Sequence, residues 1–447
     1  MSANRIFFLL LPALLVIASC NKEDNTPATI SLRSASINGG ALTDGAANVD
    51  TDANIRLVFS SSLDPAAFES ALSLSPAVAY DLSYASQSSQ VTIATAFDFN
   101  TAYTLSISEE AIGLNGGRLE APLTYTFTTK EEGGASNTAC TEATAACLSM
   151  LNLDNEATFP FYASFPIYEE QTWPGLTSAV IVVHGANRNA DDYFSYLTSS
   201  LMDTEQTAQT VLIAPPFQEE ATAQDGELYW SGNGWREGRG AAGANAVSSF
   251  EVVDRIISRL ADKEHFPALE QIVVTGHSSG GLFTHLFASA NQSEAAYPDI
   301  EFEYVVANSQ YFYYPDGQRI NESNNQLYTP TGCSGYTIWP LGYEVVPTYL
   351  SNTDAMVFNE QFTNRSITYL LGNGDGPDGA FNDTDCSATL LGSSRYQRGE
   401  NMYRYMELVY GSEHAHKRVI VPGVGHDGAG MYASDAFASL LAELLGE

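Results

Sequence analysis

Basic residues are scarce in this chain. Its 447 residues include 19 lysines and arginines against 53 aspartates and glutamates, a formal net charge of −34 at pH 7. Nucleic acids and anionic lipid surfaces repel such a chain, so charge excludes nucleic-acid binding. We interpret the acidity as a source of solubility. Hydrophobic residues make up 44% and charged residues only 16%, which is a globular composition, and the length favours two or three domains.

Cysteine is also rare, with five residues. No Cys-x-x-Cys or histidine-rich spacing is present, so no zinc site is expected. Apart from Cys20, four cysteines remain, and in an exported protein they would form two disulfides in one of three connectivities. The short separation of Cys140 and Cys147 favours a local pair, which would leave Cys333 to pair with Cys386. The alternative is that one or both pairs stay reduced.

The N-terminal apolar run, FFLLLPALLVIAS, is too short to span a bilayer and is typical of a secretory signal. It leads into residues 17–20 (IASC), which resemble the lipobox of bacterial lipoproteins, and residues 21–24 resemble an acidic export tag. The resemblance implies a signal peptide over 1–19, a lipid on Cys20 as the only membrane contact, and a tether over 20–30. It also implies an outer-membrane location, with the cell surface as one option. An ordinary signal peptide is the alternative.

Residues 31–129 are predicted to be all-β. Apolar and polar residues alternate over 55–59, 103–107 and 123–127, and turn residues separate the runs. Short strands at this spacing predict a sandwich of about a hundred residues.

The runs NVD, IRLVFSSSLD, NTAYTL and YTFTT of this segment resemble bacterial Ig-like domains of the S-layer type. The resemblance implies a spacer without catalytic residues, and carbohydrate binding is the alternative. A linker is expected over 130–138.

Residues 139–447 change character, because continuous apolar runs now alternate with helical patterns. The runs include AVIVVHG, TVLIAPP, IVVTGHS, EYVVANS, SITYLLG and RVIVPG, and helices are expected over 248–260 and 282–290. Such strands predict an α/β domain with a mostly parallel sheet covered by helices on both faces.

The segment QIVVTGHSSGGLFTHLF places Gly276-His277-Ser278-Ser279-Gly280 between a strand and a helix. This is G-x-S-x-G in the context of a nucleophile elbow, where the glycines allow a sharp turn that exposes the serine hydroxyl. Ser278 is therefore the candidate nucleophile. A glycine-rich turn without chemistry is the alternative.

A serine hydroxyl needs a base within hydrogen-bond reach. The chain has only seven histidines. His426 follows the last apolar run, whereas His277 should point away from the nucleophile, and His414 and His416 lie in a polar stretch that should be solvated.

The α/β-hydrolase superfamily, which the C-terminal part resembles, has its triad in the order Ser, acid, His. The resemblance implies His426 as base and Asp375 as acid, with Asp378 as the alternative. Asp383 and Asp385 also compete. A calcium loop using Asn373, Asp375, Asp378, Asn382 and Asp383 fits poorly, because Pro377 stands where a ligand is needed.

An oxyanion hole requires two N–H groups aimed at the developing charge. The backbone N–H of Ser279, directly after the nucleophile, is the first candidate. The turn from His184 to Asn187 resembles the H-G-x turn of the superfamily and implies Ala186, with Asn187 next, as the second donor. A plain strand-ending turn is the alternative.

Aromatic residues gather in two segments, around 229–239 and 311–349. From them we name Trp235, Arg236, Tyr311 and Trp339 as candidates for the substrate pocket, although core or cap packing competes for each aromatic. Arg236 or Arg239 could hold an anionic group on the substrate, unless neighbouring acids pair with them.

These residues together predict an exported, surface-anchored serine hydrolase that cleaves carboxylic esters through an acyl-enzyme and needs no dissociable cofactor. A polymeric or polymer-derived ester is the substrate that suits a tethered enzyme. Amide or peptide cleavage by the same triad is one alternative, and a non-catalytic glycan-binding or adhesion protein is the other. The oligomeric state stays open.

Overall fold

The computed structural model describes residues 29–446, apart from 39, 109, 131–138, 154–156, 244–245 and 380–381. The expected signal peptide, lipidated Cys20 and almost all of the linker lie outside these residues. Thr29–Ile30 form β1, so the last two residues of the segment expected to be a tether belong to a strand. No helix in the described part is both long and apolar enough to cross a membrane.

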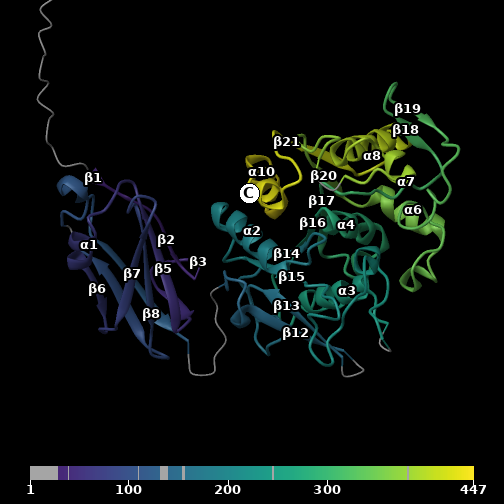
Figure 1. Cartoon of the computed structure of the whole chain (residues 1–447). Coiled ribbons are helices and arrows are strands. Elements are labelled where there is room, and N and C mark those ends of the chain that lie inside the picture. The colour runs from purple at the N-terminus through teal and green to yellow at the C-terminus, as the bar shows by residue number, and fades with distance from the viewer. Residues whose placement is uncertain are drawn as a thin grey trace, which may run out of the picture.

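The N-terminal domain is a β-sandwich, as the alternation predicted (Figure 1). One sheet has the order β3-β2-β5-β8-β7 and the other β4-β11-β9-β6, while β1 pairs with β10. The strands are β2 Leu32–Ile37, β3 Gly40–Ala41, β4 Ala46–Val49, β5 Asp52–Phe59, β6 Leu72–Ser75, β7 Tyr80–Ala85, β8 Gln90–Ala96, β9 Ala102–Ile107, β10 Arg118–Leu119 and β11 Leu123–Thr129. A short helix, α1 (Pro65–Ala71), precedes β6.

One apolar core joins the two sheets of this domain. Ile55 and Leu57 of β5 and Leu105 of β9 belong to the same cluster and have no exposed surface. The buried positions alternate along β5, as expected for strands with one face on the core and one in water.

The C-terminal domain is built on an eight-stranded sheet of order β12-β13-β15-β14-β16-β17-β20-β21. β13 is antiparallel to both of its neighbours, β12 and β15, and the other neighbouring strands of this sheet pair in parallel. This is the strand order of the α/β-hydrolase fold. The strands are β12 Leu148–Asn152, β13 Thr158–Ala163, β14 Ser178–Val183, β15 Thr210–Ala214, β16 Gln271–His277, β17 Glu301–Ala307, β20 Ile367–Gly372 and β21 Lys417–Val421.

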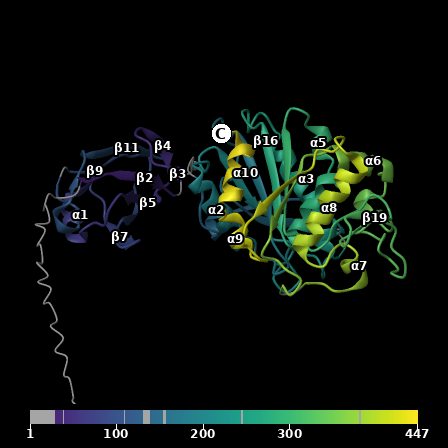
Figure 2. The same ribbon diagram turned by 90° about the horizontal axis from the view of Figure 1, so that it is seen from above.

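Helices cover both faces of this sheet (Figure 2). One core cluster contains side chains of α3, α4, α6 and α8, and a second contains those of α2, α9 and α10. The helices are α2 Ala190–Asp203, α3 Ser249–Leu260, α4 Ser279–Ala290, α5 Ser293–Ala296, α6 Ala355–Asn364, α7 Cys386–Thr389, α8 Arg395–Tyr410, α9 Gly428–Tyr432 and α10 Asp435–Leu445. Helix α4 is buried along its whole length, which makes it the central helix behind β16.

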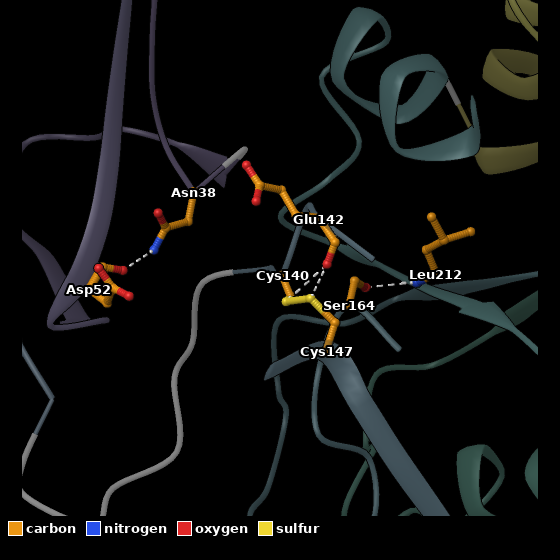
Figure 3. Close-up of a disulfide and its surroundings, with 7 residues drawn as sticks. All are labelled: Asn38, Asp52, Cys140, Glu142, Cys147, Ser164 and Leu212. Atoms are coloured by element: carbon orange, nitrogen blue, oxygen red, sulfur yellow. Dashed lines mark hydrogen bonds between the residues drawn. A yellow bond between two sulfur atoms is a disulfide. The ribbon is translucent and has the colours of Figure 1, made fainter. Parts of the chain in front are cut away.

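An insertion follows β17 and carries the short hairpin of β18 (Arg319–Asn321) and β19 (Gln326–Tyr328). Both expected disulfides are present. Cys140 bonds Cys147 ahead of β12 (Figure 3), and Cys333 bonds Cys386. The second bond therefore joins this insertion to α7, in the segment that follows the candidate acid.

Candidate active site

Ser278 lies in a strained turn between β16 and α4. Its backbone angles are φ 61° and ψ −115°, a conformation that L-residues with a side chain rarely adopt. Its N–H donates to the carbonyl of Ala307 at 3.0 Å, and its carbonyl accepts the first helical bond from Leu282 at 3.1 Å. The backbone is thus tied at both sides of the turn, and the side chain is held half-exposed at the carboxyl edge of the sheet.

The two glycines of the motif are required by close backbone packing. A Cβ on Gly276 would lie 2.4 Å from the carbonyl oxygen of Gly280. A Cβ on Gly280 would lie 2.1 Å from the carbonyl oxygen of Val183 and 2.6 Å from that of His184. Since these contacts are backbone atoms that cannot rotate away, any side chain would push α4 off the end of β14.

The structure brings Ser278, His426 and Asp375 together. Nε2 of His426 lies 2.9 Å from Oγ of Ser278, and its Nδ1 lies 3.3 Å from Oδ2 of Asp375. Nδ1 and Oδ2 are both buried, and neither forms a hydrogen bond among the described residues, so the two atoms face each other without a competing partner. Their 3.3 Å contact is within ion-pair distance but is not a hydrogen bond in this structure, and such catalytic contacts commonly tighten when substrate binds.

The loops that carry the acid and the base are fastened to each other. The N–H of Gly374 donates to the carbonyl of Val424 at 2.8 Å. The buried side chain of Asn308, at the end of β17, accepts from the N–H of Gly372 at 2.8 Å and donates to the carbonyl of Gly425 at 2.9 Å. These bonds fix the spacing of the ends of β17, β20 and β21, and with it the spacing of the triad.

Asp375 is the aspartate of this loop that faces the base. Its side chain has no exposed surface, and Oδ1 accepts from Nη1 of the buried Arg395 at 3.2 Å. Asp378 and Asp385 are exposed, and the carboxylate of Asp383 accepts from the hydroxyl of Tyr311 instead. No group of three or more histidine, cysteine or acidic side chains is arranged for a metal ion within the described ranges.

His277 lies under the candidate base. Its ring centre is 4.7 Å from that of His426, with 33° between the planes, and its Nδ1 lies 3.0 Å from the hydroxyl of Tyr193. Burial, together with the charges of His426 and Arg395 nearby, holds the pKa of His277 well below its usual value. His277 forms no hydrogen bond with Ser278. Its uncharged ring packs against the ring of His426 and supports it from below.

The turn after β14 lies against the elbow. His184 is buried, its Nδ1 lies 2.8 Å from the carbonyl of Gly185, and its Nε2 accepts from the N–H of Phe217 at 3.0 Å. Burial lowers the pKa of His184 to about 4, so the ring is neutral, and its two nitrogens hold the backbone at Gly185 and Phe217. The exposed Ala186 and Asn187 occupy the tip of the turn, and the α4 residues that follow Ser278 pack against its start.

Two of the four residues proposed for the pocket are core residues. Trp235 is buried, with its ring stacked on Phe217 at 5.6 Å. Trp339 is also buried and donates from Nε1 to the carbonyl of Glu237 at 2.9 Å. Their burial favours the core-packing alternative over direct substrate contact, because both rings hold the turn around 234–237 against the insertion.

Arg236 and Tyr311, in contrast, are partly buried beside the elbow, and each keeps some exposed surface. Nη1 of Arg236 donates to Oγ of Ser279 at 3.2 Å, and its guanidinium lies 5.3 Å from the ring centre of Tyr311. Arg239 is more exposed and pairs with Glu237 at 3.0 Å. Of the two arginines considered, Arg236 is therefore the one that contacts the residue after the candidate nucleophile.

The expectation for His416 was wrong. Its ring is buried, with Nδ1 2.9 Å from the hydroxyl of Tyr369 and Nε2 2.6 Å from the carbonyl of Phe362. Burial lowers its pKa to about 3. The polar stretch before β21 folds back under α6 at this residue, which its composition does not reveal.

Comparison with known proteins agrees with the observed sandwich. Residues 35–129 match the family model of the bacterial Ig-like domain called Big_5. The N-terminal domain is a bacterial Ig-like domain. No curated protein matches the chain at a significant level.

Several solved structures are similar to the chain at low identity. A poly(3-hydroxybutyrate) depolymerase from Bordetella parapertussis is 20% identical, with 66% of this chain and 88% of that one covered and a TM-score of 0.47. Poly(aspartic acid) hydrolase-1 from Sphingomonas sp. KT-1 is 18% identical, with coverages of 67% and 98% and a TM-score of 0.45. The fluorophosphonate-binding serine hydrolase F of Staphylococcus aureus is 11% identical, with coverages of 67% and 97% and a TM-score of 0.37. The α/β-hydrolase fold of the C-terminal domain is assigned from its own strand order.

Three residues that organise the α/β-hydrolase domain's site escaped prediction from the sequence. Arg395 lies 20 positions after Asp375 and begins α8, and Asn308 ends the run EYVVAN. Tyr193 approaches His277 from α2, 84 residues away in sequence. Asn308 could have been found, because it is a polar residue at the end of a predicted strand. Arg395 and Tyr193 could not, because their contacts with the site are distant in sequence and no local pattern marks them.

Proposed function

We propose that this protein is an exported serine hydrolase that cleaves carboxylic esters through a covalent acyl-enzyme. The observation that carries the proposal is the alignment of a strained, half-exposed Ser278 with His426 at 2.9 Å and a fully buried Asp375 behind it. A neutral serine hydroxyl is a weak nucleophile, and this arrangement supplies the base that it needs.

The steps follow from the groups present. Nε2 of His426 takes the proton of Ser278 as its oxygen attacks the acyl carbonyl, and the imidazolium is stabilised by the carboxylate of Asp375. The N–H groups of Ser279 and of Ala186, or Asn187 in its place, hold the oxyanion, and loss of one such donor typically costs ~10²–10³ in rate. His426 then protonates the leaving alcohol. In the second half of the reaction His426 takes a proton from water, the water oxygen attacks the acyl-enzyme carbonyl, and the proton returns to the oxygen of Ser278 as the carboxylic acid leaves.

The location is proposed from the sequence. A lipid on Cys20 would anchor the protein at the outer membrane, and the Ig-like domain would serve as a spacer for the hydrolase domain. An enzyme held in this way suits an ester in a polymer or released from one.

A fluorophosphonate probe tests the nucleophile. We expect the purified protein to be labelled and Ser278→Ala to be silent, with kcat toward 4-nitrophenyl esters reduced on the order of 10⁴–10⁶-fold. Ser279→Ala, one residue away, keeps the nucleophile and should still be labelled. Labelling that survives Ser278→Ala would exclude the assignment.

A further inference from the structure

Arg236 places a positive charge beside the proposed nucleophile, and a buried positive charge requires a negatively charged partner. The 3₁₀ turn of Gly234–Glu237 presents Arg236, and the turn is held rigidly by Trp235 in the core. Its side chain is only 14% exposed. A guanidinium with so little water around it is costly unless an anion or strong acceptors lie close.

The protein itself neutralises this guanidinium poorly. Among the described residues its ion-pair partner is Glu237, whose Oε1 is 4.0 Å from Nε, and the other oxygen of Glu237 is bound by Arg239 at 3.0 Å. Nε of Arg236 is buried and has no hydrogen-bond partner among the described residues. Its one hydrogen bond given by the structure goes to a neutral hydroxyl, that of Ser279.

The other acid in the neighbourhood is already committed. Asp383 accepts from the hydroxyl of Tyr311 through Oδ2 and from the N–H of Asp385 through Oδ1 at 2.9 Å. Burial opposes the shift, but the hydrogen bond from Tyr311 and, to a smaller extent, the charges of Arg398 and Arg236 lower the pKa of Asp383, so this carboxylate acts on Arg236 from a distance. The guanidinium itself lies over the ring of Tyr311. Tyr311 and Ser279 therefore orient Arg236, while among the described residues no carboxylate is hydrogen-bonded to its guanidinium.

We infer that Arg236 forms an anion subsite of this hydrolase, so that its preferred substrates are esters with a carboxylate a few bonds from the scissile carbonyl. The inference rests on the proposed function. Ser279 fixes the position of this subsite relative to the nucleophile. It directly follows Ser278, and its hydroxyl accepts a hydrogen bond from Arg236. A carboxylate that completes the guanidinium's pairing would thus fix the substrate next to Ser278.

The test compares matched esters that differ in charge. Mono-4-nitrophenyl glutarate is paired with its neutral methyl ester for the acyl side, and 4-carboxyphenyl butyrate with phenyl butyrate for the alcohol side. We expect the native protein to prefer the anionic member of at least one pair, after correction for alkaline hydrolysis rates. Because a charge-assisted bidentate contact is the stronger kind of hydrogen bond, Arg236→Gln should lower that ratio of kcat/KM by about 10–10²-fold.

The controls separate charge from folding. Arg404→Gln removes the same charge from an exposed ion pair on α8 and should leave both ratios unchanged. Arg236→Lys keeps the charge but loses the paired N–H donors of the guanidinium. Its ratio of kcat/KM for the anionic ester over the neutral ester should therefore fall between those of the native protein and Arg236→Gln. Fluorophosphonate labelling of each variant reports whether the nucleophile is still assembled.

The outcomes are distinct. If neutral esters are cleaved in a Ser278-dependent way but neither ratio favours the anion in the native protein, or neither changes in Arg236→Gln, the subsite is refuted and the proposed function stands. If Arg236→Gln does not fold, the native preference and Arg236→Lys decide. If no ester is cleaved and no label is taken up, the proposed function itself fails.

Discussion

At the scale of single residues, the surroundings of Asp375 favour it as the acid behind the candidate base His426. Its carboxylate is buried between Arg395 and His426, with one oxygen toward each. Asp378, three residues on, is exposed to water. A buried carboxylate fixed on one side can hold an imidazole in one tautomer, whereas an exposed one is screened and mobile.

We therefore expect Asp375→Asn to lower kcat on 4-nitrophenyl esters by about 10⁴-fold, because an amide favours the wrong tautomer of His426. Asp378→Asn is the matched control and should retain kcat within about threefold, as for other exposed substitutions. Equal losses in the two variants, measured by steady-state kinetics, would refute the choice of acid.

At the scale of elements, the site exists because three chain segments meet at the carboxyl edge of one sheet. The start of α4 packs on the end of β14 through Gly280, and the loops after β20 and β21 are joined by the bond from Gly374 to Val424. Sites of open α/β sheets generally lie at this edge. Of these contacts, the one at the elbow should tolerate added side-chain atoms least, because the backbone of Gly280 packs directly against the backbone of Val183 and His184.

Gly280→Ala should therefore destabilise the fold by about 1–3 kcal/mol or more, the usual cost of overpacking, and abolish most activity by moving Ser278. Gly175→Ala is the control, because a Cβ there meets nothing within 4 Å. Urea denaturation and ester hydrolysis of the two variants measure both effects. A stable, active Gly280→Ala would show that α4 is not held as closely as described.

At the scale of the whole molecule, buried neutral histidines link stability to pH. His184, His277, His285 and His416 are all buried, and burial lowers the pKa of each, to about 4 for His184 and about 3 for His285 and His416. Their folded pKa values lie below the unfolded value of 6.5. Below pH 6.5 the unfolded chain therefore binds protons that the folded chain does not, and stability is lost as pH falls.

Each such histidine should remove about 2 kcal/mol of unfolding free energy between pH 7 and pH 5. In His285→Gln that difference between the two pH values should be smaller by a similar amount, while the half-exposed His414→Gln should change it much less. Urea unfolding at both pH values measures this. A variant His285→Gln with the native pH dependence would contradict a buried neutral ring.

The sequence by itself determined much of this protein, because the deciding signals were local. Alternation over 55–59 and 103–107 predicted strands of a sandwich, and continuous apolar runs predicted the parallel sheet. The strand, tight turn and helix around Ser278 predicted the elbow, since two glycines and a buried strand allow few other conformations. The separation of Cys140 and Cys147 pointed to their disulfide.

The tertiary structure decided what depends on contacts between distant segments. It placed Asp375 rather than Asp378 toward His426, because only the buried position is enclosed by Arg395. It turned Trp235 and Trp339 into core residues and buried His416, since packing, not residue type, decides whether an aromatic ring lines a pocket or fills a core. It also left Arg236 beside Ser279 without a hydrogen-bonded carboxylate, because among the described residues Glu237 binds Arg239 and Asp383 binds Tyr311.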